Sequence, residues 1–329
     1  MTLGFTCRAV LLACVGVLLG TGGAKAQEFT PRLAYVAQPS NPFHAGMQKF
    51  ADAVKVRSNG RIQVQLFHSS QLGGERDYIE GMQLGSMDMA ATSTGALTAF
   101  EPRIALFSLP FIFSSPEHYD KVVDGPIGKE MSQRILAKGV RVLGYTDMGA
   151  RYIMNSQRAI KNPADLRGLK MRVIQDPVPL ATYSAMGARA IPMARPEVYS
   201  ALKQGVLDGL DNGLAFYESM GDFEVAKYLT LGVQIFQTPG SLMVSERFFQ
   251  KLPKDLQVAL IQAGADALSE QRKLFRQGDS TILKRLQDKG VLVQTADPIP
   301  FQALASPVWD KFEDRVGGRA AIDAVVNTK

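Results

Sequence analysis

Apolar and polar positions alternate along several short stretches of the chain, and helix-forming stretches separate them. The segment Arg61 to Phe67 shows this alternation, which is typical of a half-buried strand. Asn41 and Pro42 are favoured residues for the first positions of a helix. The pattern predicts strands near 33–36, 61–67 and 86–92, with helices at 42–58 and 75–84 between them. This order is typical of a parallel, doubly wound α/β sheet, in which ligands bind beyond the carboxyl ends of the strands.

A second α/β unit is predicted from Gly149 onward, after a strand at 140–145. Its expected strands lie at 152–155, 169–174, 188–193 and 207–210, and its expected helices at 177–186 and 196–204. Further along, we expect an extended segment at 228–236, a strand at 241–244, a helical region at 253–289, a strand at 291–293, and a terminal helix from about Pro300. The fold class is therefore α/β with two units.

Residues 1–26 have the composition of a secretory signal peptide. Arg8 precedes the apolar run 9–19, and Ala24-Lys25-Ala26 is a small-x-small cleavage site. We expect cleavage after Ala26. Both cysteines of the chain lie in this segment, so disulfides, thiol catalysis and cysteine metal sites are excluded from the mature protein.

The charge and motif content exclude several functions. Loss of the signal lowers the net charge from +6 to +4, and no dense basic block indicates nucleic acid binding. The common nucleotide, hydrolase and metalloprotease motifs are absent. His44, His68 and His118 lie far apart in the sequence, so we expect no metal site and no cofactor.

Arg172 is the main candidate for ligand binding. Met171 and Val173 flank it on a predicted strand, where neighbouring side chains point to opposite faces. If these two face the core, Arg172 faces a cleft, where its guanidinium group matches a carboxylate with two parallel hydrogen bonds. The alternative is an ordinary solvated arginine.

Arg195 is a second candidate because it precedes a predicted helix that starts at Pro196. Arginine cannot cap that helix, and its charge repels the positive end of the helix dipole. An anionic partner would remove the conflict. We therefore expect Arg195 to contact a second acidic or polar end of the ligand, favouring a diacid or an oxo or hydroxy acid. The alternative is a side chain that extends into water.

An ordered set of short motifs resembles the DctP-type periplasmic solute-binding proteins of tripartite ATP-independent periplasmic (TRAP) transporters. The motifs run through almost the whole mature chain and comprise 70–73 (SQLG), 149–151 (GAR), 162–173 (NPADLRGLKMRV), 196–202 (PEVYSAL) and 205–209 (GVLDG). The resemblance implies two lobes joined by a hinge, a central cleft, and a long helix that spans both lobes. It also implies a chain that crosses between the lobes, with lobe I at 27–148 and 238–277 and lobe II at 149–237 and 278–329.

The resemblance also implies a binding site. The family's arginine at the position of Arg172 pairs with the ligand carboxylate, and the residues that match Arg151 and Asn212 support it. For Arg151, the alternative is an interdomain salt bridge.

Four further residues are expected at or near the cleft. Glu75 matches a polar position on the cleft rim. Ser93 stands where sialic acid-binding relatives have glutamate, which argues against sialic acid as the ligand. Gln38 and Gln237 are candidates for direct or water-mediated contacts.

The expected protein is a monomeric periplasmic receptor that binds a small organic carboxylate and delivers it to a TRAP membrane permease. The rival interpretations are a secreted α/β enzyme acting on organic acids and a ligand-sensing partner of a membrane receptor. The sequence leaves open whether the carboxylate is a C4 diacid, an oxo or hydroxy acid, an aromatic acid or a sugar acid.

Overall fold

The structure is a computed structural model that describes residues 27–329, so the predicted signal peptide lies outside the described residues. Ten strands form a mixed sheet in the order β2-β1-β3-β9-β4-β7-β5-β6, with β8 paired to β4 and β10 to β8. The strands are β1 Arg32–Tyr35, β2 Gln65–Phe67, β3 Met89–Ser93, β4 Val140–Asn155, β5 Lys170–Val173, β6 Arg189–Pro192, β7 Gly209–Asn212, β8 Tyr228–Leu231, β9 Phe236–Ser245 and β10 Leu292–Thr295.

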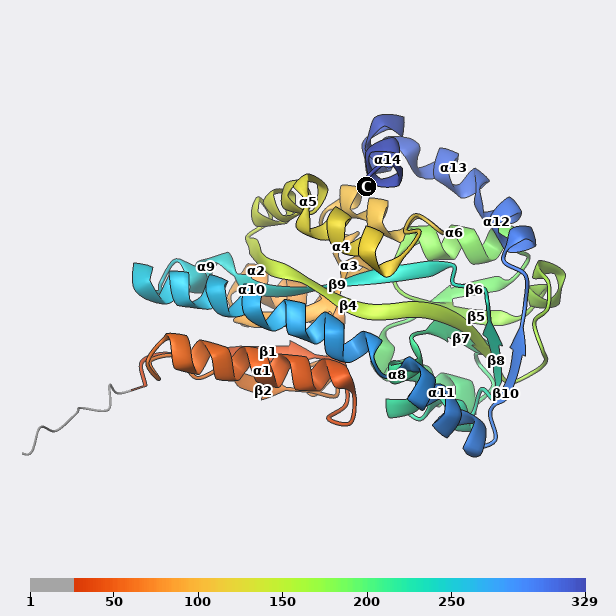
Figure 1. Cartoon of the computed structure of the whole chain (residues 1–329), viewed down its shortest axis with the longest axis horizontal. Coiled ribbons are helices and arrows are strands. Elements are labelled where there is room, and N and C mark those ends of the chain that lie inside the picture. The colour runs from red at the N-terminus through yellow and green to blue at the C-terminus, as the bar shows by residue number, and fades with distance from the viewer. Residues whose placement is uncertain (1–26) are drawn as a thin grey trace, which may run out of the picture.

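The sheet has two halves, and each is the centre of one lobe. Strands β1, β2 and β3 are parallel in the first lobe, and β5, β6 and β7 are parallel in the second. Strands β4 and β9 are antiparallel partners that run through both halves, as Figure 1 shows at the middle of the molecule. The lobes are therefore joined by continuous strands, as well as by loops.

Strand β4 differs from the predicted pair of separate strands. It is one strand of 16 residues, and the expected restart at Gly149 is an irregularity within it. Its pairing with β9 shifts register between Asp147 and Ala150, and Gly149 has φ +82°, which glycine adopts without strain. The expected extended segment 228–236 is also wrong as one element, because Gly232 turns the chain (φ +83°) between β8 and β9.

The helices cover both faces of the sheet. They are α1 Pro42–Arg57, α2 Glu75–Leu84, α3 Thr94–Leu97, η1 Pro102–Ser108, α4 Pro116–Asp124, α5 Pro126–Leu136, η2 Pro163–Leu166, α6 Pro177–Ala185, η3 Arg195–Glu197, α7 Val198–Lys203, α8 Leu214–Ser219, η4 Asp222–Glu224, α9 Glu246–Phe249, α10 Lys254–Arg276, α11 Asp279–Asp288, α12 Ile299–Ala305, α13 Pro307–Val316 and α14 Arg319–Val326. The long helix α10 packs between α1 and β4 (Figure 1). Helix α11 continues the chain into the second lobe, and the expected single terminal helix is three short ones.

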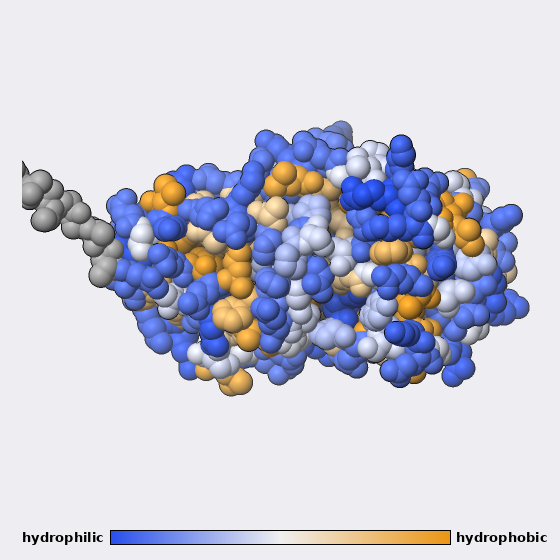
Figure 2. All heavy atoms as spheres, turned by 90° about the horizontal axis from the view of Figure 1, so that it is seen from below, coloured by the Kyte–Doolittle hydropathy of each residue, from blue (hydrophilic) through white to orange (hydrophobic). Residues whose placement is uncertain are grey.

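The apolar residues form two buried clusters. The larger one includes the β1 and β3 side chains and continues under α10, and the smaller one lies in the second lobe around Met171 and Val173. Figure 2 shows a mainly hydrophilic face on which hydrophobic residues lie in separate patches. Among residues 27–329, every helix is too short or too polar to cross a membrane.

Candidate functional site

A small polar cavity lies between the two lobes. Its volume is about 30 Å³, which is enough for a water molecule but small for an organic acid. A carboxylate ligand can therefore enter only if the lobes separate or the side chains move. The walls come from α2, β3 and the end of β1 in the first lobe, from β5, η3, β7 and α8 in the second, and from β4, which runs through both. They are formed by Val36, Glu75, Ser93, Met148, Arg151, Arg172, Ile174, Arg195, Asn212, Phe216 and Met220.

Arg172 lies on β5 with Met171 and Val173 in the core beneath it, as its position on the strand predicts. Its Nε and Nη2 donate to the Met193 carbonyl at 3.0 and 2.9 Å. The side chain is buried, and no carboxylate of residues 27–329 forms an ion pair with it. Burial, followed by repulsion from Arg151 and Arg195, lowers its pKa to about 9. An anion at this position would relieve both effects.

Arg151, in contrast, already has a carboxylate partner. Its Nε donates to Asp211 Oδ2 at 2.8 Å, and its Nη2 donates to Oδ1 at 3.0 Å and to the Asp211 carbonyl at 2.6 Å. Burial opposes the charge on Arg151, but Asp211 outweighs burial and raises the pKa of the arginine. Asp211 lies on β7, the direct neighbour of β4, so this ion pair is internal to the second lobe.

Arg195 is also paired. Its Nη2 donates to Asp222 Oδ1 and Oδ2 at 2.7 and 2.9 Å, and Asp222 is fully buried. Neither the expected ligand carboxylate nor solvent is needed to compensate the charge of Arg195, because the chain supplies the anion. Its Nη1, however, is buried and has no hydrogen-bond partner in the part of the chain that the structure describes. That atom remains available for a polar group in the cavity.

Glu75 reaches into the same cavity from the first lobe. Its Oε1 accepts from the Ser93 amide at 2.5 Å, and its Oε2 accepts from the Ser93 hydroxyl at 2.9 Å. Burial raises the pKa of Glu75, against the opposing effects of these hydrogen bonds and of Arg172 and Arg151. Asn212 lies buried at the end of β7, where its Oδ1 accepts from the Gly213 amide at 3.0 Å. The cavity therefore brings a carboxylate and an amide close to the arginines.

Two of the predicted residues lie outside the cavity wall. Gln38 accepts a hydrogen bond from the Ser69 hydroxyl at 2.6 Å. Gln237 donates to Asp147 Oδ1 at 2.7 Å and lines a different cavity, next to Phe275 and Arg276. In this conformation both amides serve contacts within the protein.

Two carboxylates that neutralise arginines, Asp211 and Asp222, were not expected from the sequence. Asp211 lies just beyond the strand expected at 207–210, but in the structure it is part of the four-residue strand β7, which is wholly buried. A charged residue inside a buried strand is costly unless it is paired. The apolar residues near Asp211 in the sequence therefore indicate that it is buried and that it has a cationic partner. Asp222 lies in a short 3₁₀ helix and gave no such signal.

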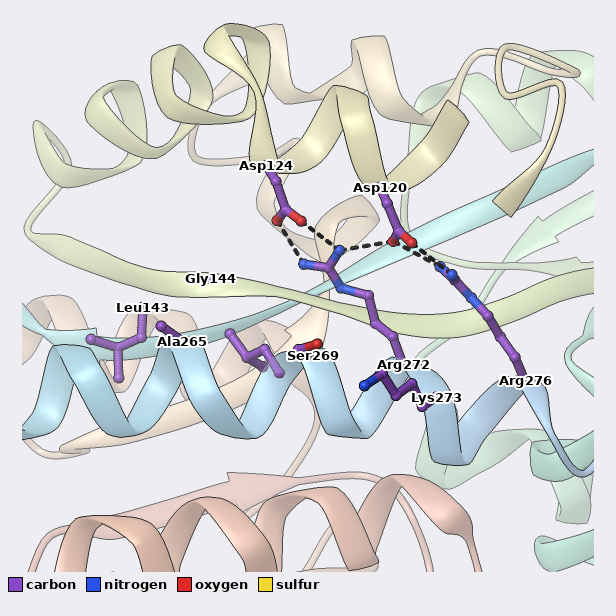
Figure 3. Close-up of a pocket in the computed structure, with 10 residues that line it drawn as sticks. Asp120, Asp124, Leu143, Gly144, Ala265, Ser269, Arg272, Lys273 and Arg276 are labelled. Atoms are coloured by element: carbon purple, nitrogen blue, oxygen red, sulfur yellow. Dashed lines mark hydrogen bonds and ion pairs between the residues drawn. The ribbon is translucent and has the colours of Figure 1, made fainter. Parts of the chain in front are cut away.

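A second group of arginines lies along β4, between α4 and α10 (Figure 3). Asp120 and Asp124 of α4 accept hydrogen bonds from Arg272, and Asp120 also accepts from Arg276. Asp147 accepts from Arg276 Nε at 2.6 Å. The adjoining cavity has a volume of about 500 Å³, but both of its arginines are matched by carboxylates. No group of three or more potential metal ligands (His, Cys, Asp or Glu) is found among residues 27–329.

Comparison with known proteins places the chain in a family. The model of the bacterial extracellular solute-binding proteins, family 7 (DctP), matches residues 33–315. A solute-binding protein of Verminephrobacter eiseniae is 36% identical over 277 residues, covering 84% of this chain and 82% of the relative.

Comparison with solved structures identifies the same family. A TRAP periplasmic solute-binding protein of a Polaromonas species, bound to D-erythronate, has a TM-score of 0.89 at 32% identity and covers 92% of this chain and 99% of its own. One from Sulfurospirillum deleyianum, with bound succinate, has a TM-score of 0.88 at 30% identity, covering 92% and 100%. The chain therefore belongs to the DctP family of extracytoplasmic solute receptors of TRAP transporters.

Proposed function

We propose that this receptor binds a hydroxylated monocarboxylate, of the sugar acid type, in the cavity between the lobes. The observation that carries the proposal is the buried guanidinium of Arg172, which has no carboxylate partner among the described residues. The ligand carboxylate supplies that partner. Lobe closure excludes water from the pair and strengthens it, because the effective dielectric constant falls.

The charges around Arg172 favour one carboxylate over two. Arg151 and Arg195 are already neutralised by Asp211 and Asp222. A second ligand carboxylate would find no unmatched arginine in the cavity and would approach the carboxylate of Glu75. Like charges at short distance in a buried site are unfavourable.

Hydroxyl groups, in contrast, find both donors and acceptors in the cavity. Glu75 accepts hydrogen bonds, and the free Nη1 of Arg195 donates one. The amide of Asn212 does both. These contacts agree with the hydroxy acid among the earlier alternatives, and one relative binds D-erythronate. The relative with bound succinate is similarly close, so the test must include both classes of acid.

A thermal-shift panel of the mature protein tests this proposal. The panel contains D-erythronate, D-galactonate and D-gluconate as hydroxy acids, succinate as a diacid, and butyrate as an acid without hydroxyls. At 100 times Kd a ligand adds about 2.7 kcal/mol to the free energy of unfolding. We expect the largest shift from a hydroxy acid. A larger shift from succinate would contradict the preference for one carboxylate, and no shift from any acid would contradict the assigned site.

The remaining expectations belong to the same proposal. We infer cleavage after Ala26, a monomer, delivery of the ligand to a TRAP permease, and no covalent chemistry on it. We also infer that lobe I comprises 27–148 and 238–277, and lobe II 149–237 and 278–329. The register shift in β4 and the break between α10 and α11 support the boundaries near 148 and 277, because both are points where the backbone can bend.

A further inference from the structure

Asp176 is a buried carboxylate that takes no part in the proposed ligand contacts. It precedes α6 in the second lobe, where its Oδ1 accepts from the Val178 amide at 2.9 Å and caps the helix. Its other oxygen, Oδ2, is buried and has no hydrogen bond of normal geometry to any of residues 27–329, and the residue is only 2% exposed. A charged oxygen in such a position is unfavourable.

The first lobe provides much of the cover over Asp176. A Cβ atom placed on Gly95, in α3, would lie 3.3 Å from Asp176 Oδ2. Ser108 of η1 is buried as well, and its hydroxyl lies close enough to Asp176 to favour the ionised carboxylate. Next to Asp176, the Arg76 side chain of the first lobe donates to the Gln175 carbonyl at 2.6 Å. The burial of Asp176 therefore depends on contact between the two lobes.

Two cationic groups act on Asp176. They are Arg76 of α2 and Arg315 of α13, and each favours the ionised carboxylate, as do the Ser108 hydroxyl and the Val178 amide. Burial outweighs them and raises the pKa of Asp176 from 3.8 to about 6. When the lobes separate, water reaches the carboxylate and its pKa returns toward the lower value.

We propose that Asp176 is a positioning residue that couples closure of the lobes to the uptake of a proton. The inference rests on the proposed function, because ligand binding is what closes the lobes. Closure of the lobes is favoured when Asp176 is neutral. The contribution of Asp176 to ligand affinity is therefore complete below pH 3.8 and is lost as the pH rises through about 6. Ligand affinity should therefore increase as the pH falls from 8 to 5.

The expected size follows from the two pKa values. A group with a pKa of 3.8 in the open form and about 6 in the closed form strengthens binding about tenfold between pH 8 and pH 5. At pH 5 it takes up about 0.8 proton per ligand bound. Glu75 also has a raised pKa, and it faces the ligand. The contribution of Asp176 must therefore be obtained as a difference between variants.

Asp176→Asn is the decisive variant, because asparagine keeps the helix cap and removes the charge. Asp297→Asn is the matched control, because Asp297 accepts from the Ile299 amide at 3.0 Å on an exposed helix start. Both variants and the wild type are titrated calorimetrically with the tightest binder of the acid panel, at pH 5 and pH 8. Buffers of low and high ionisation heat give the number of protons taken up.

The results separate this inference from the proposed function. At pH 8 we expect Asp176→Asn to bind the ligand at least about tenfold more tightly than wild type does. The increase in affinity between pH 8 and pH 5 should be about tenfold smaller in the variant, and the variant should take up about 0.8 fewer protons per ligand bound at pH 5. Asp297→Asn should match wild type throughout. If Asp176→Asn binds with the wild-type pH dependence and proton uptake, Asp176 is only a helix cap and the inference is wrong. Absence of binding by wild type would instead contradict the proposed function.

Discussion

The two arginine groups of this protein contain the same kinds of charged residue, but they differ in whether every arginine has a carboxylate partner among residues 27–329. Between α4 and α10, the carboxylates of Asp120, Asp124 and Asp147 accept every ion pair that Arg272 and Arg276 form. In the cavity between the lobes, the acceptor of Arg172 among residues 27–329 is a backbone carbonyl, that of Met193. The number of arginines therefore does not identify an anion site. A buried arginine that lacks a carboxylate partner does.

The largest effect on stability should come from Arg151→Ala. This change leaves the Asp211 carboxylate, whose side chain is 2% exposed, without its ion-pair partner. Removing one member of a buried pair costs about 3–5 kcal/mol of the free energy of unfolding. Urea denaturation of the ligand-free protein measures it. Arg172→Ala is the control, because it removes an unpaired buried charge and should leave stability equal or higher. Equal losses in the two variants would contradict the division into paired and unpaired arginines.

A smaller effect is expected from Glu75→Gln, and it should depend on the ligand. The neutral amide is a poorer acceptor for ligand hydroxyls, and hydrogen bonds to charged groups contribute about 1.5–3 kcal/mol. We expect binding of a sugar acid to weaken about tenfold, while binding of butyrate stays the same or improves. Calorimetric titration of both acids gives the comparison. Equal weakening for both would show that Glu75 does not act on the hydroxyl groups.

The smallest effect on binding should come from Arg272→Ala. Arg272 contacts Asp120 and Asp124, which are 34% and 59% exposed, so its pairs are partly screened by water. We expect a lower melting temperature and a Kd within about threefold of wild type, a difference of less than 0.7 kcal/mol. A large loss of affinity would mean that the group along β4 controls closure of the lobes.

Strand position predicted the placement of Arg172, whereas the family resemblance implied Arg151, Asn212 and Glu75. Alternation around Arg172 placed it opposite the core residues Met171 and Val173, and the structure has that arrangement. The two-lobed α/β fold and the family were confirmed. The roles of Arg172, Arg151 and Asn212 in ligand binding remain predictions.

What the sequence could not predict are the pairings between distant segments. Arg195 meets Asp222 because η4 folds back onto the start of η3, and no local pattern encodes that contact. The continuity of β4 was also hidden, since Gly149 is typical of a break and here occupies an irregularity within one strand. In both cases tertiary contact determined the outcome.

The most direct test of the central claim is the affinity of Arg172→Ala for the tightest binder of the acid panel, measured by calorimetry beside wild type and Arg272→Ala. Loss of a buried, hydrogen-bonded charge pair costs about 2–5 kcal/mol, which weakens binding by at least tens-fold. We predict that loss for Arg172→Ala alone. If Arg172→Ala binds within threefold of wild type, Arg172 does not hold the ligand carboxylate, and the account of the site is wrong.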